Sequence, residues 1–170
     1  LNHHVDAATF RAITTLLLSA PETPLIFQGQ EWATSAPFLF FTDHHDELGR
    51  QITSGRREEF ASFAAFADPA LRSKIPDPQA ADTFARSRLP WHELQQPAHA
   101  AMLRLYQRLF GLRATAVPLR ATARDSFDVR ALDAETLLLL RRHDDEQLWL
   151  VVRLAGAGTA TVCDAGAART

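Results

Sequence analysis

The stretch from residue 28 to residue 50 carries most of the side chains in this sequence that could bind or transform a ligand. Its planar hydrogen-bonding groups are Gln28, Gln30, Glu31, Asp43, His44, His45, Asp46 and Glu47, and its aromatic rings are Trp32, Phe38, Phe40 and Phe41. An aromatic face can cover the C–H face of a sugar ring, while carboxylates, amides and imidazoles bind hydroxyl groups in directed pairs. The mixture favours a polyhydroxylated ligand. For each ring the hydrophobic core remains the alternative, and for the polar groups a solvated loop.

The carboxylates of this stretch also allow hydrolytic chemistry on their spacing alone. Glycosidic cleavage needs two carboxyl groups held about 5 to 10 Å apart, one of them protonated. Glu31, Asp43, Asp46 and Glu47 could supply such a pair. The alternative for Glu31 is a buried structural carboxylate that accepts hydrogen bonds from backbone amides.

The run Asp43, His44, His45 and Asp46 is the densest group of potential metal ligands. In an extended segment His44 and His45 point to opposite sides, and no distant Cys or His motif would complete a site, so we expect no metal. We expect instead that His44 donates to a sugar hydroxyl and that Asp43 fixes its tautomer. No Gly-rich phosphate loop, GxSxG elbow or CxxC pair occurs, and no cofactor is expected.

The elements around this stretch predict an α/β arrangement. Asp6 is placed to cap a helix that runs to about Ser19, with Phe10, Ile13, Leu16 and Leu17 on one face. Residues 24–27 are a short apolar run typical of a fully buried strand, and Gly29 gives the backbone freedom directly after it. Ligand sites of parallel α/β folds gather where strands end, which is where residue 28 follows.

Three further segments follow on the way to residue 111. A helix is predicted from Ser54 or Gly55 to Ala67, in which Arg56 or Arg57 either holds a carboxylate of the preceding loop or belongs to a solvated charge cluster. Residues 74–97 are expected to form an ordered loop over the strand-end site. The clearest helix runs from Gln96 or Pro97 to Gly111, with Met102 in the core, and is expected to pack on the strand at 24–27.

After residue 113 the pattern predicts strands. The candidates are residues 117–120, 135–141, 147–154 and 159–163, with a polar hairpin loop at 143–146 and the single cysteine, Cys163, as a small buried residue. Meander strands after α/β units indicate a second, all-β domain that begins near residues 112–120. The fold class is therefore α/β followed by all-β, with the second domain expected to be cut short at Thr170.

Composition and charge limit the kinds of partner that this chain is expected to bind. The 170 residues are 46% hydrophobic, the net charge is −2, and acids and bases are interspersed, so neither nucleic acid nor a membrane surface is an expected partner. A complete (β/α)8 barrel needs about 250 residues, so this chain cannot hold one. Leu1 in place of a methionine fits a fragment or a processed product. No signal peptide or membrane span is visible, and a cytoplasmic location is expected.

Three runs closely resemble the maltooligosyltrehalose trehalohydrolases, members of the alpha-amylase clan of glycoside hydrolases. They are PLIFQGQEWATSAPFLFFTDHHDELGR at 24–50, TSGRREEF at 53–60 and IPDPQAADTFARSRLPW at 75–91. The resemblance implies a catalytic (β/α)8 TIM barrel followed by a β-sandwich, and hydrolysis of the alpha-glucosidic bond that releases trehalose from maltooligosyltrehalose. The family's three catalytic carboxylates would all lie before Leu1, because Asn2, His3 and His4 do not match its NHD-type motif.

The resemblance assigns residues 1–111 to the C-terminal part of the barrel and residues 112–170 to an incomplete β-sandwich. It predicts that the isolated chain is inactive, contains no catalytic residue, and needs the missing N-terminal portion of the barrel to act on a maltooligosaccharide or trehalose-type substrate. The predicted substrate-binding residues are Gln30, Glu31, Trp32, Phe41, Asp43, His44 and Arg50. A fragment of a related branching enzyme and a non-catalytic carbohydrate-binding module remain the alternatives.

Overall fold

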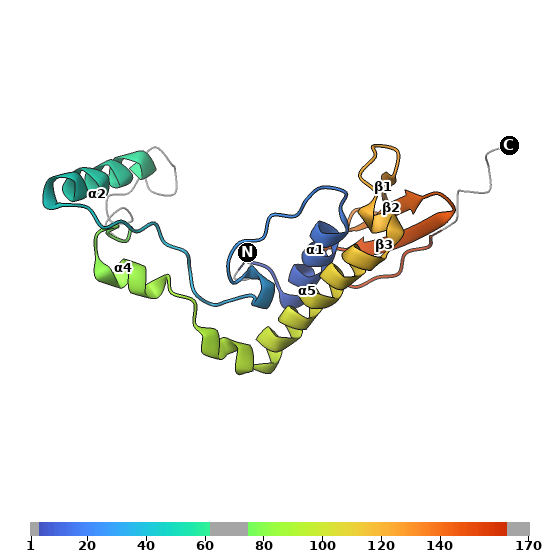
Figure 1. Ribbon diagram of the computed structural model, residues 1–170, viewed down its shortest axis with the longest axis horizontal. Helices are drawn as coiled ribbons and strands as arrows, with labels where there is room; N and C mark the ends of the chain where they lie inside the picture. Colours follow the sequence, from blue (N-terminus) through green and yellow to red (C-terminus); the bar gives the residue numbers. More distant parts are fainter. Residues whose placement is uncertain (1–3, 62–74, 163–170) are drawn as a thin grey trace. The chain divides into compact units, whose positions relative to one another are not determined.

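The computed structural model describes residues 4–61 and 75–162, which form two compact units. The first unit comprises Leu1–Ala33 and Leu94–Thr170, and the second comprises Thr34–Glu93. The first contains helices α1 (Ala7–Ser19), α5 (Pro97–Thr115) and α6 (Val117–Arg120), the short 3-10 helix η1 (Gln30–Trp32), and strands β1 (Phe127–Ala131), β2 (Thr136–His143) and β3 (Glu146–Arg153) (Figure 1). The second contains α2 (Asp46–Ala61) and α4 (Ala81–Arg86), with the 3-10 helix η3 (Trp91–Gln95) at its end.

Helix α1 confirms the prediction for residues 6–19. The Asp6 carboxylate accepts hydrogen bonds from the backbone N–H groups of Ala8 and Thr9 at 2.8 and 2.9 Å, which satisfies two donors at the helix start. Of the predicted face, Phe10 is buried, whereas Ile13, Leu16 and Leu17 are only partly buried, and the other buried residues are Thr14, Leu18 and Ser19. The apolar pattern missed Thr14, whose hydroxyl lies 3.4 Å from the hydroxyl of Tyr106 and so can be buried.

Helix α5 forms the main hydrophobic core together with α1. Phe10 and Leu18 of α1 pack with Met102, Tyr106 and Leu109 of α5, which confirms the core position of Met102. The predicted stop at Gly111 is wrong, because α5 continues to Thr115. One glycine costs a helix only about 1 kcal/mol relative to alanine, so it need not end one, whereas Pro118 cannot extend α5 further.

Residues 24–27 do not form the predicted buried strand. Within the described residues the single sheet is β1–β2–β3, and none of its strands pairs with this segment. Leu25 is 90% exposed, whereas Ile26 packs against the core cluster of α1 and α5. A strand depends on its hydrogen-bonded neighbours as well as on its own residue types, and the described chain supplies no neighbour here. Gly29 does have the positive φ, 82°, that its position suggested.

The C-terminal region contains a three-stranded antiparallel sheet. The strands β2 and β3 confirm the predicted hairpin, which turns at Asp144 and Asp145, with Asp144 at φ 48°. The strand β1 pairs with β2 and was not predicted. Residues 117–120, predicted as a strand, instead form α6, because Pro118 at the first turn suits a helix start. Residues 159–162 have no strand structure, and Cys163 lies outside the described residues.

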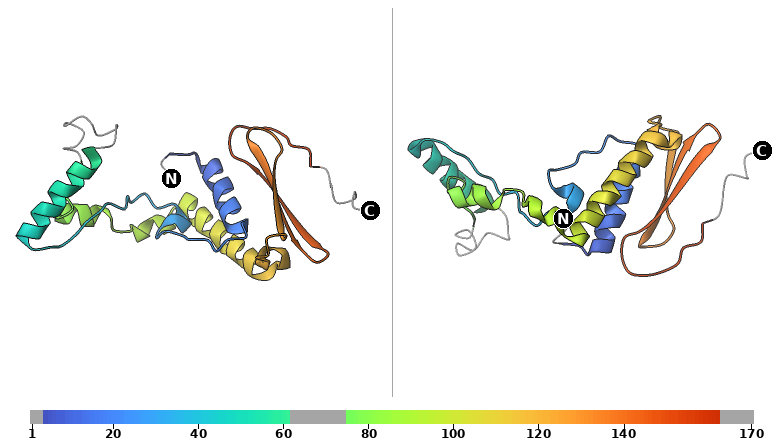
Figure 2. Two further views of the ribbon diagram at one scale, coloured as in Figure 1. Left: turned by 90° about the horizontal axis from the view of Figure 1, so that it is seen from above. Right: turned by 60° about the horizontal axis from the view of Figure 1, so that its bottom comes forward.

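Arg141 of the sheet and Arg113 of α5 both donate to carbonyl oxygens at the end of α1. Arg141 of β2 is 0% exposed and donates from Nη1 to the carbonyl oxygen of Ser19 at 2.6 Å and from Nη2 to those of Leu119 and Ala121. Burial lowers the pKa of Arg141, with a further contribution from the nearby charge of Arg113. Figure 2 shows α1 and α5 on the same side of the sheet, with α1 in contact with β3. The guanidinium groups thus satisfy carbonyls that the helix end leaves without donors.

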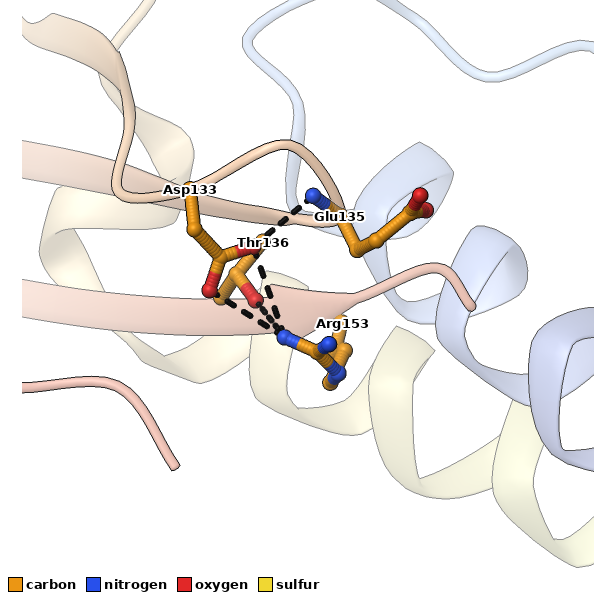
Figure 3. Close-up of polar contacts among 4 residues, drawn as sticks. All are labelled: Asp133, Glu135, Thr136 and Arg153. Atoms are coloured by element: carbon orange, nitrogen blue, oxygen red, sulfur yellow. Dashed lines mark hydrogen bonds and ion pairs between the residues drawn. The ribbon is translucent and has the colours of Figure 1, made fainter. Parts of the chain in front are cut away.

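A polar cluster ties the turn before β2 to the end of β3 (Figure 3). Arg153 donates from Nη1 to Asp133 Oδ2 at 3.1 Å and to the hydroxyl of Thr136 at 2.7 Å. Asp133 also accepts the backbone N–H of Glu135 at 2.8 Å. That N–H, followed by Thr136 and Arg153, holds the pKa of Asp133 below its usual value. The cluster fixes the register of the hairpin at its open end.

In the second unit, hydrogen bonds join the segment before α2, residues 34–45, to the later segment, residues 75–93. Glu93 is 5% exposed and accepts from the hydroxyls of Thr34 and Ser35, and Ser87 Oγ accepts the backbone N–H of Leu39 at 3.1 Å. Helix α2 begins at Asp46, eight or nine residues before the predicted start, and residues 62–67 of the prediction lie outside the described residues. Residues 74–97 were predicted to be an ordered loop over the end of a strand at 24–27; residues 75–97 are ordered but contain α4 and η3, that strand is absent from the described sheet, and Lys74 lies outside the described residues.

Candidate functional site

Gln30 and Glu31 lie on η1 in the first unit. The Gln30 amide donates from Nε2 to the hydroxyl of Tyr106 at 2.9 Å, and its Oε1 accepts the backbone N–H of Phe27 at 3.3 Å. Glu31 Oε2 is buried and has no hydrogen-bond partner among the described residues. Buried carboxylate oxygens in proteins usually accept a hydrogen bond, so this atom is an acceptor open to a further donor.

Trp32 ends η1 and is only 2% exposed. Its carbonyl oxygen lies 2.8 Å from Nδ1 of His99 on α5. An indole this deeply buried offers almost no surface for stacking on a sugar ring within the first unit. Its part in a ligand site stays a prediction.

Phe41 lies in an aromatic group of the second unit. Its ring makes edge contacts with Phe38 at 6.0 Å and Phe84 at 5.1 Å between centroids. Phe38 is 57% exposed and Phe84 is 50% exposed. The group therefore keeps aromatic surface open to solvent, as a sugar platform requires, although edge-to-face contacts of this kind are equally common between core residues.

Asp43, His44 and Arg50 line one polar pocket of about 530 Å³, which lies entirely within the second unit. Asp43 and His44 come from the segment before α2, and Arg50 comes from its second turn. Asp77 and Gln79, from the turn before α4, line the same pocket. The volume of the pocket lies in the range of small-molecule sites. Three of the seven predicted substrate-binding residues thus line one cavity of that size.

Gln79 holds the segment before α2 in place. Its Oε1 accepts the backbone N–H of His44 at 3.2 Å and the hydroxyl of Thr42 at 3.2 Å, and its Nε2 lies 3.4 Å from the carbonyl oxygen of His44. A Cβ at Gly49 would lie 2.1 Å from Gln79 Nε2, so the absence of a side chain lets α2 approach this amide. The Gln79 amide offers one acceptor and one donor, so it bonds to the backbone of His44 as a neighbouring peptide group would and joins the two segments of the unit.

The charges in the pocket are partly compensated. The backbone N–H of Gln79 at 3.0 Å and then the Thr53 hydroxyl at 2.8 Å hold the pKa of Asp77 below its usual value, with a smaller contribution from Arg57. Arg50 forms an exposed ion pair with Glu47 at 2.8 Å and so lowers the pKa of that carboxyl. Asp77 is therefore ionised at neutral pH and acts only as an acceptor.

Among the hydrogen bonds of the described residues, neither Arg56 nor Arg57 bonds to a carboxylate of the preceding loop, and Arg56 instead follows the alternative of a charge cluster within the helix. Arg56 pairs with Glu59 of its own helix at 3.2 Å, and its guanidinium lies over the rings of Phe40 and Phe60 at 4.9 and 4.6 Å. Phe40 belongs to the preceding segment, so the contact there is with an aromatic face. Arg57 lines the pocket beside Asp77.

The residues missed by the sequence reasoning are Asp77, Gln79 and Thr53. Asp77 stands between Pro76 and Pro78, and Gln79 follows Pro78; these prolines mark a turn but give no sign of which segment the turn contacts. In the part of the chain that the structure describes, no group of three or more His, Cys, Asp or Glu side chains is arranged to hold a metal ion. Among the same residues, no helix is long and apolar enough to cross a membrane.

Comparison with solved structures identifies the class of protein. A crystal structure described as a putative alpha amylase from Salmonella typhimurium matches with a TM-score of 0.73 and 32% identity, over 88% of this chain and 25% of that chain. The described helices and small antiparallel sheet are thus those of part of an alpha-amylase-like protein. No family model matches the chain.

Curated relatives narrow the class to one enzyme family. Malto-oligosyltrehalose trehalohydrolase from Deinococcus radiodurans is 41% identical over 159 residues, which are 92% of this chain and 23% of that protein. The proteins of the same name from Arthrobacter ramosus and Mycobacterium tuberculosis are 40% and 36% identical over 74% and 81% of this chain, and 21% of each relative is covered. The chain is homologous to the C-terminal part of malto-oligosyltrehalose trehalohydrolases, which confirms the family resemblance. It spans about a fifth of their length.

Proposed function

We propose that this chain forms part of a trehalohydrolase that hydrolyses the alpha-glucosidic bond releasing trehalose from maltooligosyltrehalose. The observation that carries the proposal is the 41% identity to the Deinococcus radiodurans protein over almost the whole chain. The polar pocket in the second unit supports it, because hydroxyl-binding groups gather there in a cavity of the right size. We place the whole protein in the cytoplasm.

In this proposal residues 1–111 complete a TIM barrel and residues 112–170 belong to a β-sandwich. The exposure of Leu25 and the unpartnered oxygen of Glu31 support the presence of further protein beside residues 24–31. An apolar residue that is 90% exposed gains about 25 cal/mol for each Å² of surface that a neighbour covers. A neighbouring barrel strand would cover Leu25 and could supply a donor to Glu31.

The chain contributes substrate-binding residues and no catalytic carboxylate. The substrate-binding residues of this proposal are Gln30, Glu31 and Trp32 in the first unit and Phe41, Asp43, His44 and Arg50 in the second. The acid and the nucleophile come from the N-terminal portion of the barrel. The isolated chain is therefore expected to be inactive, since glycoside hydrolysis requires both carboxyl groups.

A chimera tests this proposal. The segment of the Deinococcus radiodurans relative that matches this chain is replaced by the 170 residues, and trehalose released from maltotriosyltrehalose is measured. We expect activity in the chimera and none in the isolated chain or in the relative lacking its own segment. A chimera that is folded by circular dichroism but inactive, or an isolated chain that releases trehalose, contradicts the proposal.

A further inference from the structure

The pocket of the second unit is lined in part by residues that the sequence did not indicate as ligand-binding. Asp77 lines the same cavity as Asp43 and His44, and Arg57 reaches this cavity from α2. All of these residues belong to Thr34–Glu93, so the cavity needs no residue from the first unit. About 530 Å³ is enough for a small ligand such as a mono- or disaccharide.

The charge of the lining favours a neutral ligand. Asp43, Asp46 and Asp77 supply three carboxylates, and Arg50 and Arg57 supply two guanidinium groups, so opposite charges nearly balance. An anion would meet the carboxylates and a cation would meet the guanidinium groups, and each would lose hydration without full compensation. A hydroxyl group can both donate to a carboxylate and accept from a guanidinium, so a polyol satisfies both kinds of side chain.

The way the wall is held favours specific recognition. Asp77 is fixed by the backbone N–H of Gln79 and the hydroxyl of Thr53, which leaves Oδ2 available for a ligand among the hydrogen bonds of the described residues. The backbone of His44 is fixed through both its N–H and its carbonyl by the Gln79 amide. Groups that are already held in place lose little conformational entropy when they bind a ligand.

We propose that this pocket binds a glucosyl unit through its hydroxyl groups and that Arg57 and Asp77 are specificity-determining residues of the site. The proposal rests on the proposed function for the identity of the sugar and adds residues that the family resemblance did not assign. Arg57 donates to a hydroxyl oxygen, and Asp77, which lines the pocket beside it, accepts a hydroxyl proton. No aromatic side chain lines the pocket among the described residues, so affinity here comes from hydrogen bonds.

The test is a titration of the 170-residue chain with trehalose and, separately, with maltotriose, followed by the NMR shifts of the backbone amides. We expect saturable shifts at His44 and Gln79 with at least one of the sugars, and the sugar that saturates at lower concentration identifies the preferred linkage. Arg57→Gln and Asp77→Asn should each weaken binding about tenfold or more. Asp82→Asn, on α4 outside the pocket, is the control and should leave binding unchanged.

Absence of shifts at His44 and Gln79 with both sugars overturns the inference, as does unchanged affinity in Arg57→Gln. Because Asp77 also bonds to Thr53 and Gln79, the shifts of the ligand-free Asp77→Asn chain are recorded first, and Arg57→Gln decides the result if they differ from those of the unsubstituted chain. An active chimera with unaltered KM in Arg57→Gln would refute the pocket and leave the proposed function intact. Sugar binding by the chain together with an inactive chimera would support the pocket and refute the proposed function.

Discussion

Gly49 provides a sharp test of how the pocket wall is held. It lies in α2 against Gln79, where a Cβ would come within 2.1 Å of Nε2 and 2.9 Å of Cδ. Gly49→Ala must therefore displace the Gln79 amide, and we expect this shift to break its three hydrogen bonds to Thr42 and His44. Gly55 is the matched control, because it lies in the same helix and a Cβ there would meet nothing within 4 Å.

The expected effects follow from helix propensity and hydrogen bonding. Alanine is favoured over glycine in a helix by about 1 kcal/mol, so Gly55→Ala should raise the free energy of unfolding by about that amount. Gly49→Ala gains the same term but loses three bonds worth about 0.5 kcal/mol each, the lower value being appropriate to exposed groups. Gly49→Ala should therefore be about 1.5 kcal/mol less stable than Gly55→Ala.

Urea unfolding followed by circular dichroism measures this difference, and hydrogen exchange reports on the wall directly. The amide of His44 donates to Gln79, so it should exchange faster in Gly49→Ala and at an unchanged rate in Gly55→Ala. The same substitution should weaken sugar binding through the displaced His44 backbone. Equal stabilisation by both substitutions, with unchanged His44 exchange, would refute the role given to Gln79.

Two further predictions concern charged groups. Arg141→Met leaves the carbonyls of Ser19, Leu119 and Ala121 without their buried donor. It should therefore lower the free energy of unfolding, measured in urea, by about 3 kcal/mol. A loss no larger than that caused by the control Arg142→Met, at the neighbouring position, would contradict this prediction. Asp77 has a folded-state pKa below its usual 3.8, so the stability it contributes is present above that pH and lost as the pH falls through the lower, folded value. Asp77→Asn should thus flatten the dependence of stability on pH between about pH 5 and pH 3, and an unchanged slope would argue against the bonds assigned to this carboxylate.

Local patterns predicted the elements that local physics determines. The cap at Asp6, the apolar repeat around Met102 and Tyr106, and the two apolar runs on either side of Asp144 each specify a helix or a hairpin within a short window. The strand prediction at residues 24–27 failed because pairing depends on a distant neighbour. Pro118 shows the same limit at shorter range, since its run reads as apolar but its backbone favours the first turn of a helix.

Only the part of the candidate site that comes from residues 28–50 could be predicted from the sequence. Asp43, His44 and Arg50 stood out because polar groups are crowded into one stretch, and the structure places all three around one cavity. Their partner Gln79 lies 35 residues after His44, and nothing in the intervening sequence encodes that contact. Family resemblance likewise points to this stretch without saying which atoms face a ligand.

The most direct test of the central claim, that Asp43, His44 and Arg50 belong to a trehalohydrolase sugar site, is the kcat/KM of the chimera for maltotriosyltrehalose. Single variants Asp43→Asn, His44→Gln and Arg50→Gln are compared with the unsubstituted chimera, with the control Asp82→Asn alongside. The account predicts a loss of about tenfold or more in kcat/KM for the Asp43 and His44 variants, since each removes a hydrogen bond to a sugar hydroxyl, and no change for the control. Values within about twofold of the unsubstituted chimera for all three variants would contradict it.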